Sequence, residues 1–157
     1  MNPSPLVTDL AQQADKLSDR YYRLLLLVGP SGKGKTKLLH AVRDQRGVPY
    51  LNVNAALSER LLEHPKSQRP LEVLPILQQL ISEHPSDILL LDNIELLFDP
   101  DLRQDPLRCL QALSRNRSLI VAWNGEYRDG VLTYAEPSHR EYRRYEKPDA
   151  VIIPVGG

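Results

Sequence analysis

The sequence has little cysteine, no excess of charge of either sign and no long hydrophobic run. Cys109 is its only cysteine, which excludes an intrachain disulfide framework and a cysteine-based metal site. Twenty Lys and Arg residues balance twenty Asp and Glu residues. No global positive charge therefore favours nucleic acid or an anionic membrane, and any such contact needs a local patch. Even the apolar run from Leu24 to Val28 is far too short to cross a bilayer.

Targeting and metal signals are also absent. The first residues, MNPSPLVTDLAQQAD, lack the basic-then-apolar plan of a signal peptide. Together with the single cysteine, this leads us to expect a reducing, cytoplasmic location without membrane contact. The four histidines show no metal-ligand spacing. What remains is 157 residues, 41% hydrophobic and 25% charged, which predicts one globular domain, 1–157, with a sizeable core.

The stretch that carries chemical information is GPSGKGKT, from Gly29 to Thr36. It matches the pattern G-x-x-x-x-G-K-[ST], and it follows a strand-like apolar run and precedes a helical pattern. In such a loop, glycines let successive backbone N–H groups turn inward around phosphate oxygens, and the following helix adds its positive end. Lys35 can reach the β- and γ-phosphates, and the Thr36 hydroxyl can ligate Mg²⁺. The residues predicted to bind the nucleotide are Gly29, Pro30, Ser31, Gly32, Lys33, Gly34, Lys35, Thr36 and Lys37.

A second motif ends in Asp92, which follows the apolar run from Ile88 and is the predicted partner of Thr36 at Mg²⁺. The next residue is Asn93, where a P-loop ATPase that hydrolyses efficiently usually has a carboxylate. Asn can orient a water molecule but cannot accept its proton. Glu95 can serve as the base if the backbone turns after the strand, and Glu126 is a second candidate. Either can equally be a solvated surface carboxylate.

Asn124 ends the strand-like run SLIVAWN and is a candidate for contact with the γ-phosphate or the attacking water. Asn before Gly is also common in turns, so an ordinary structural role stays open. Ligands of open parallel sheets lie beyond the carboxyl ends of the strands, and the phosphate loop, Asp92 and Asn124 all fall there. The residues predicted to take part in catalysis are Lys35, Asp92, Asn93, Glu95 and Asn124.

Apolar strands alternate with helical patterns along the chain, which predicts right-handed βαβ connections. We expect an α/β fold: a three-layer α/β/α P-loop core with a mainly parallel sheet of about five strands. The predicted strands are 21–28, 50–54, 87–93, 118–124 and 149–155, and 131–134 is expected to form half a hairpin with residues around Tyr127. The predicted helices are 37–45, 55–62, 71–83, 107–115 and 137–147. An N-terminal helix within 1–20 precedes the core, 21–157.

The segment from His139 to Lys147, HREYRRYEK, mixes basic, acidic and tyrosine residues. An arginine there can cross a subunit boundary and stabilise charge on the neighbour's γ-phosphate. The arginine finger candidates are Arg140, Arg143 and Arg144, with Arg115 and Arg117 as weaker ones. Alternatively the segment binds nucleic-acid backbone while Tyr142 or Tyr145 stacks on bases. A solvated helix face with pairs such as Glu141–Arg144 is the third reading.

With these motifs in place, the chain resembles the AAA+/STAND branch of P-loop ATPases. The resemblance maps the Walker A residues onto Gly29, Gly34, Lys35 and Thr36, the Walker B aspartate onto Asp92, and the first sensor residue onto Asn124. The chain departs from that branch at Asn93, where a glutamate is usual. It also stops soon after its last predicted strand, so we expect a core without the family's C-terminal helical lid and second sensor arginine.

Within that branch, the size of the chain and the segment EPSHREYRRYEKPD resemble the small BrxF P-loop protein family of type III BREX phage-defence systems. This resemblance implies a bacterial cytoplasmic ATPase that works with other defence-system proteins and with DNA-modification partners.

We therefore expect an Mg-ATP-binding ATPase that acts as an oligomerising switch, since AAA+ relatives bind ATP between subunits. ATP is the expected base because no guanine-recognition stretch is present. One alternative is a nucleotide-binding adaptor with little or no hydrolysis, which Asn93 favours. Another is a DNA-binding accessory subunit that uses residues 139–147. A small-molecule kinase remains open too, although no segment is an obvious lid.

Overall fold

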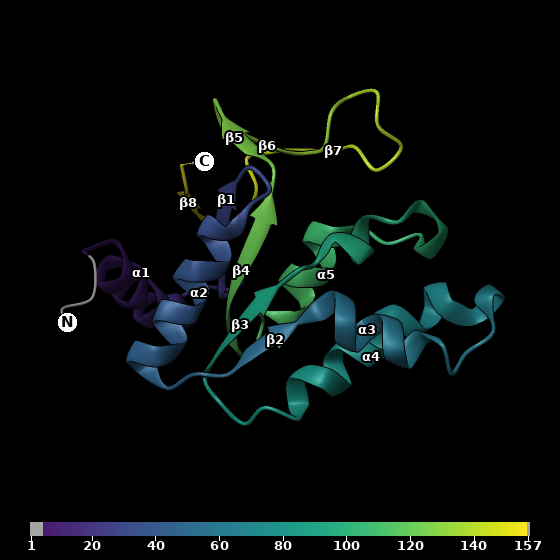
Figure 1. The fold of residues 1–157 in the computed structure, drawn as a ribbon, viewed down its shortest axis with the longest axis horizontal. Coiled ribbons are helices and arrows are strands. Elements are labelled where there is room, and N and C mark those ends of the chain that lie inside the picture. The colour runs from purple at the N-terminus through teal and green to yellow at the C-terminus, as the bar shows by residue number, and fades with distance from the viewer. Residues whose placement is uncertain (1–4, 157) are drawn as a thin grey trace.

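The computed structural model describes residues 5–156 and is built around one parallel sheet. Its strands are β1 (Leu24–Gly29), β2 (Tyr50–Asn52), β3 (Ile88–Asp92), β4 (Ser118–Asn124) and β8 (Val151–Pro154). They lie in the order β2-β3-β4-β1-β8 and every pairing is parallel (Figure 1). The expected α/β fold with a mainly parallel sheet is therefore confirmed.

Helices cover both faces of this sheet, which explains why β1 is apolar throughout. The helices are α1 (Pro5–Asp15), α2 (Lys33–Arg46), α3 (Val53–Leu61), α4 (Arg69–Ser82) and α5 (Pro106–Leu113), with short 3₁₀ turns η1 (Lys16–Asp19), η2 (Lys66–Gln68), η3 (Glu95–Phe98) and η4 (Pro100–Leu102). On β1, Leu25 and Leu27 pack with α1 and α2, whereas Leu24, Leu26 and Val28 pack with α3, α4 and α5. A strand buried on both faces needs apolar residues at consecutive positions.

The ends of several elements differ from the predicted ones by a few residues. The second strand stops at Asn52 because the Asn52 side chain caps α3 by accepting a hydrogen bond from the Ala55 backbone N–H at 3.1 Å. The predicted N-terminal helix is α1 followed by η1, and residues 1–4 of that prediction lie outside the described residues. Within residues 5–156, no helix has the length and apolar character needed to span a membrane.

A second, antiparallel sheet, the small sheet, connects β4 to β8. It consists of β5 (Glu126–Arg128), β6 (Val131–Tyr134) and β7 (Arg143–Glu146). β5 and β6 form a hairpin whose turn residues, Asp129 and Gly130, have φ values of 53° and 78°. Asp-Gly is suited to such a turn because both positions need positive φ. The hairpin was expected, whereas its pairing with β7 was not.

The helix predicted for 137–147 is wrong, because this segment forms a loop followed by β7. Exposure alternates along β7: Arg143 and Tyr145 are half-buried, and Arg144 and Glu146 are exposed. This is the period of a strand rather than of a helix. Tyr145 donates a hydrogen bond to Asp105 Oδ1 at 2.8 Å, and its ring meets that of Trp123 at 6.0 Å between centroids. These long-range contacts override the helical preference of the charged residues.

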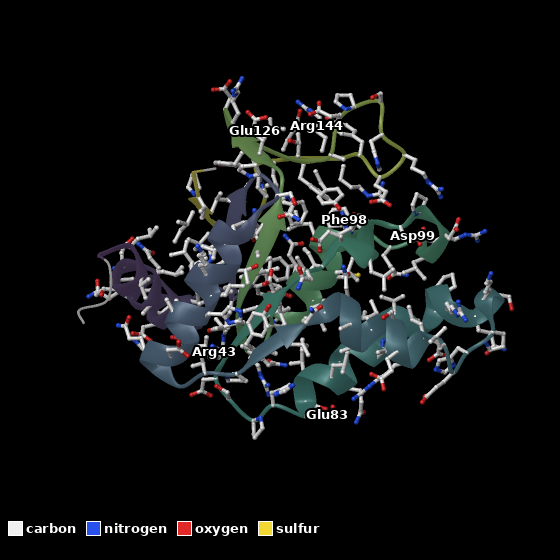
Figure 2. All side chains as sticks on the ribbon, viewed as in Figure 1. Arg43, Glu83, Phe98, Asp99, Glu126 and Arg144 are labelled. Atoms are coloured by element: carbon white, nitrogen blue, oxygen red, sulfur yellow. The ribbon has the colours of Figure 1, made fainter. Side chains whose placement is uncertain are left out.

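Aromatic side chains fix the small sheet to the main sheet. Phe98 of η3 lies below the small sheet (Figure 2) and stacks on Tyr134, with ring centroids 3.6 Å apart. Trp123 packs edge-on against Phe98, and its indole N–H donates to the Thr133 carbonyl at 3.1 Å. The small sheet is thereby held next to the carboxyl end of β4.

Candidate active site

The predicted site residues meet at one edge of the main sheet. Gly29 lies beside Asn124 in the pairing of β1 with β4, and Asp92 lies beside Asn52 in the pairing of β3 with β2. The phosphate loop, Asp92 and Asn124 therefore share the edge at which ligands of parallel sheets bind. Glu95, three residues after Asp92, is the first residue of η3.

The phosphate loop leaves β1 at Gly29 and enters α2 at Lys33. A Cβ on Gly29 would collide with the carbonyl oxygen of Val155. Gly32 has a φ of 152°, which residues with a side chain rarely adopt. Both glycines thus let the chain turn closely into the helix, whose first backbone N–H groups point toward the loop.

Lys35 is folded back onto its own loop. Its ammonium group donates to the Gly29 carbonyl at 2.9 Å and to the Pro30 carbonyl, and the residue is only 3% exposed. Burial lowers the pKa of Lys35, and the charges of Asp92 and Glu95 oppose this effect. Bound phosphates would offer the ammonium group stronger, charged partners than carbonyls. Lys37 is exposed on α2, and the side chain of Lys33 lies outside the described part of the chain.

Asp92 is buried at the end of β3 and accepts three hydrogen bonds. Oδ2 accepts from the Thr36 hydroxyl at 2.8 Å and from the Tyr50 hydroxyl at 2.7 Å, and Oδ1 accepts from the Asn93 backbone N–H at 3.0 Å. A hydroxyl and a carboxylate oxygen in contact are the donor set that Mg²⁺ uses beside substrate phosphates. No group of three or more His, Cys, Asp or Glu within residues 5–156 could hold a metal. The residues therefore fit an Mg²⁺ ion that is shared with a nucleotide, rather than a cage made by the protein alone.

Tyr50 also belongs to this network, although no motif in the sequence points to it. Burial raises its pKa above the usual value for tyrosine, and the hydrogen bond to Asp92 adds to the effect, so the phenol stays a donor. Tyr50 pairs with Leu90 across β2 and β3, two positions before Asp92. Residues two apart on a strand share a face, but that relation can be used only once the pairing of the two strands is known.

Glu95 enters the site because the backbone turns sharply after β3. Asn93 has a φ of 54°, in the left-handed region, and its carbonyl accepts a hydrogen bond from the Asn54 backbone N–H at 2.8 Å. Asn is one of the residues that tolerates this conformation. The turn on which the role of Glu95 depends is thus present, and η3 begins at Glu95.

Glu95 and Asn124 are in direct contact. The Asn124 amide donates to Oε1 of Glu95 at 2.8 Å, while Oε2 is buried and has no hydrogen-bond partner among the described residues. Burial raises the pKa of Glu95, and the nearby charge of Asp92 adds to this, whereas Lys35 and Asn124 oppose it. A carboxylate with a raised pKa is a better proton acceptor near neutral pH.

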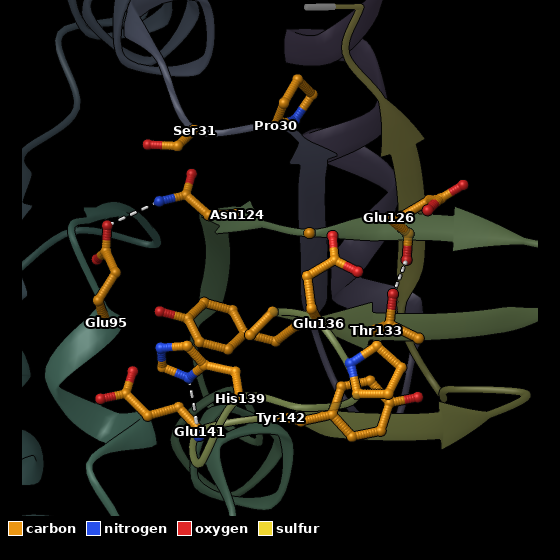
Figure 3. A pocket seen from close by; sticks show the side chains of 14 residues that line it. Pro30, Ser31, Glu95, Asn124, Glu126, Thr133, Glu136, His139, Glu141 and Tyr142 are labelled. Carbon is orange, nitrogen blue, oxygen red and sulfur yellow. Dashed lines mark hydrogen bonds between the residues drawn. The ribbon is translucent and has the colours of Figure 1, made fainter.

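An open cleft of about 680 Å³ adjoins this pair. Pro30 and Ser31 of the phosphate loop form one side, and Asn124, joined to Glu95 by a hydrogen bond, lies near Ser31 (Figure 3). The small sheet and the loop before β7 form the other side, through residues that include Glu126, Glu136, His139, Glu141 and Tyr142. Among the described residues that line the cleft there are four glutamates and no lysine or arginine. Its surface therefore favours a cationic group.

The arginine finger candidates do not line this cleft. Arg143 donates to the Gln104 carbonyl at 3.2 Å, and Arg144 pairs with Glu146 at 2.7 Å on the exposed side of β7. Arg140 lies in the loop, 3.6 Å from Asp101, and is exposed. The weaker candidates are also engaged, Arg115 over the ring of Tyr21 at 3.5 Å and Arg117 by the Ile81 carbonyl at 2.7 Å. Within its own chain, none of these arginines serves the candidate site.

The hypothesis that residues 139–147 bind nucleic acid assumed a helix, and this segment does not form one. Tyr145 is packed against Trp123 and bonded to Asp105, so its ring is not free to stack on a base. Tyr142 instead lines the cleft beside Glu141. Glu126, the second candidate base, lines the cleft (Figure 3) and is exposed. It pairs with Arg128 at 3.0 Å.

Comparison with known proteins bears on the family and the fold of the chain. A family model described as "ATPase family associated with various cellular activities (AAA)" matches residues 25–116, more than half of the chain. No curated protein matches. Among solved structures, PCH-2 from C. elegans is similar with a TM-score of 0.50 and 20% sequence identity. The similarity covers 96% of this chain and 42% of that one, so the chain spans less than half the length of PCH-2.

Proposed function

The chain belongs to the AAA family of ATPases, and on that basis we propose that it binds Mg-ATP and hydrolyses it with Glu95 as general base. The observation that carries the proposal is the contact of Glu95 with Asn124 at the edge of the sheet that also holds Lys35, Thr36 and Asp92. Asn93 replaces the usual glutamate, but the turn at Asn93 brings in a carboxylate two residues later.

Each residue has a distinct task in this reaction. Thr36 and Asp92 would hold Mg²⁺, which neutralises charge on the β- and γ-phosphate oxygens when it is bound. Lys35 leaves its loop carbonyls and donates to these phosphates. Glu95 accepts the proton of the attacking water, and its raised pKa favours this transfer. The Asn124 amide holds Glu95 and can also donate to the γ-phosphate.

We further propose that the protein works as an oligomer. The cleft beside the γ-phosphate position is lined by glutamates, and the described residues of the same chain supply no arginine to it. Charge that develops on the transferred phosphoryl group would be stabilised by an arginine from a neighbouring copy. Arg140 suits that task best, since it is exposed on the loop whose neighbouring residues form the cleft wall.

A role in phage defence is the finer part of the proposal. It rests on the resemblance of the segment EPSHREYRRYEKPD to the BrxF family, and it implies partners among other defence-system proteins. ATP-driven assembly would then switch the protein between a free form and a form bound to those partners.

A nucleotide-binding adaptor with little hydrolysis is the second candidate. The observation in its favour is Asn93 itself, together with the position of Glu95, whose free oxygen is buried rather than exposed to water. In that case nucleotide binding alone would drive assembly.

Size-exclusion chromatography with light scattering, with and without Mg-ATP, tests these proposals when phosphate release is assayed on the same fractions. The ATPase proposal expects an ATP-dependent increase in mass and turnover in the assembled fractions. Replacing Lys35 or Asp92 with Ala should remove both. An increase in mass without phosphate release would support the adaptor, and the absence of both effects contradicts both functions.

A further inference from the structure

The Asp92 carboxylate has a second hydroxyl donor, Tyr50, which belongs neither to the phosphate loop nor to the motif that ends in Asp92. The phosphate-loop residue Thr36 supplies the first, and Tyr50 of β2 supplies the second, both to the same oxygen. Their distances, 2.8 Å and 2.7 Å, are those of good O–H···O hydrogen bonds. A carboxylate oxygen with two donors and a partner oxygen bound to a backbone N–H has little freedom to rotate.

The position of the Tyr50 hydroxyl is itself fixed. Tyr50 pairs with Leu90 in the main sheet, and its side chain is partly buried and packs against the core cluster between the sheet and the helices α1 and α2. The ring of His40 from α2 packs on it at 4.6 Å between centroids. The pairing and the packing together hold the hydroxyl at the end of β3, where Asp92 lies.

We propose that Tyr50 is a positioning residue for the Mg²⁺ site: its hydroxyl holds the Asp92 carboxylate in the orientation that receives the ion together with Thr36. The proposal rests on the proposed function, because it concerns the same metal. Carboxylates that serve metals are commonly oriented by hydrogen bonds from outside the metal's own ligands, and loss of such a bond weakens metal binding by about 10- to 100-fold.

A purely structural role for Tyr50 makes a different prediction, and the chain offers a matched control. Tyr145 also donates its hydroxyl to a carboxylate, Oδ1 of Asp105, at 2.8 Å, but it does so in the small sheet. Tyr50→Phe and Tyr145→Phe therefore each remove one partly buried hydroxyl–carboxylate bond and keep the ring. A role in stability alone would give the two variants the same behaviour toward Mg²⁺.

The test is calorimetric titration of the non-hydrolysable ATP analogue AMP-PNP into the full chain. The titration is done over a series of Mg²⁺ concentrations and again in EDTA, with thermal melting of each variant as a check of folding. For Tyr50→Phe we expect the half-saturating Mg²⁺ concentration to rise about tenfold or more, with the metal-free affinity unchanged. For Tyr145→Phe we expect both quantities to stay as in the unaltered protein.

Three outcomes overturn the proposal. An unchanged Mg²⁺ requirement in Tyr50→Phe shows that Thr36 and the Asn93 backbone N–H orient Asp92 without Tyr50. An equal loss of affinity with Mg²⁺ and with EDTA shows that Tyr50 acts on the nucleotide or on packing. If the unaltered protein itself binds no Mg-nucleotide, the proposed function fails first, and that result is distinct from the other two.

Discussion

The amide of Asn124 donates to Oε1 of Glu95 at 2.8 Å, which joins the end of β4 to the first residue of η3. The other carboxylate oxygen, Oε2, is buried without a partner among the described residues. The two side chains therefore act as one unit in the lining of the cleft. Changes to either one should be coupled rather than additive, because they share a hydrogen bond.

Glu95→Gln should lower the rate of phosphate release by about 100-fold or more while nucleotide affinity stays the same. The amide keeps the size of the side chain and can still accept from Asn124, but it cannot take a proton from water. Glu126→Gln is the matched control, because Glu126 also lines the cleft but is exposed. Steady-state turnover and calorimetry separate the two effects. If Glu126→Gln loses turnover and Glu95→Gln does not, Glu126 rather than Glu95 is the general base.

Glu95→Gln should also stabilise the free protein in a pH-dependent way. Because burial raises the folded-state pKa of Glu95 above its unfolded value, its contribution to stability is fully present below the unfolded pKa and is lost as pH rises through the folded pKa. Glutamine does not titrate. The melting temperature of the variant should thus gain on that of the unaltered protein as pH rises from acidic to neutral.

We expect the gain in melting temperature to be larger at neutral pH than at acidic pH. Melting curves from acidic to neutral pH, without nucleotide, measure it. A gain that is the same at every pH, or that shrinks toward neutral pH, would show that the charge of Glu95 is not the cause.

Asn124→Ala should reduce both stability and turnover. It removes the donor to Glu95 Oε1, and a hydrogen bond to a charged group contributes about 1.5–3 kcal/mol. Urea unfolding measures the loss of stability. In the double variant with Glu95→Gln, the loss in turnover should be well below the sum of the two single losses. Additive losses would show that the two residues act separately.

Gly29→Ala should destabilise the fold by about 1–3 kcal/mol, because the new methyl group meets backbone rather than a flexible side chain. Val155 cannot withdraw easily, since its N–H donates to the Val28 carbonyl at 2.8 Å. The control is Gly34→Ala, whose nearest neighbour would be Val155 Cγ1 at 4.0 Å.

The control variant should keep or slightly gain stability, because Ala is favoured over Gly in a helix by about 1 kcal/mol. Denaturant unfolding compares the two. Equal stability of the two variants would contradict the close approach of Val155 to the phosphate loop.

Arg140→Ala should lower turnover in the assembled state without affecting nucleotide binding, if Arg140 acts on the site of a neighbouring copy. Arg144→Ala is the control, because Arg144 pairs with Glu146 on the exposed side of the small sheet (Figure 2). Mixing Arg140→Ala with a Glu95→Gln chain should restore part of the activity, since each chain then supplies what the other lacks. Unchanged turnover in Arg140→Ala would show that Arg140 does not stabilise the γ-phosphate of a neighbouring copy.

Contiguous patterns predicted much of the fold. The apolar run of β1 followed by GPSGKGKT specified a strand, a loop and a helix, because all of their determinants lie within a few residues of one another. The five parallel strands followed from the alternation of strands and helices, because parallel neighbours need crossover connections. The run 137–147 misled the prediction, because its charged residues favour a helix while Tyr145 has its partners in Trp123 and Asp105.

By itself, then, the sequence determined the phosphate loop and the aspartate at the end of β3, since each is encoded by neighbouring residues and a fixed local conformation. Tertiary structure alone decided which carboxylate meets Asn124, and that Tyr50 bonds to Asp92 from 42 positions away. Such contacts depend on strand order and on a turn at Asn93 with positive φ. Neither the strand order nor this turn can be predicted from a short stretch of sequence, because both arise only when distant segments bury their apolar faces together.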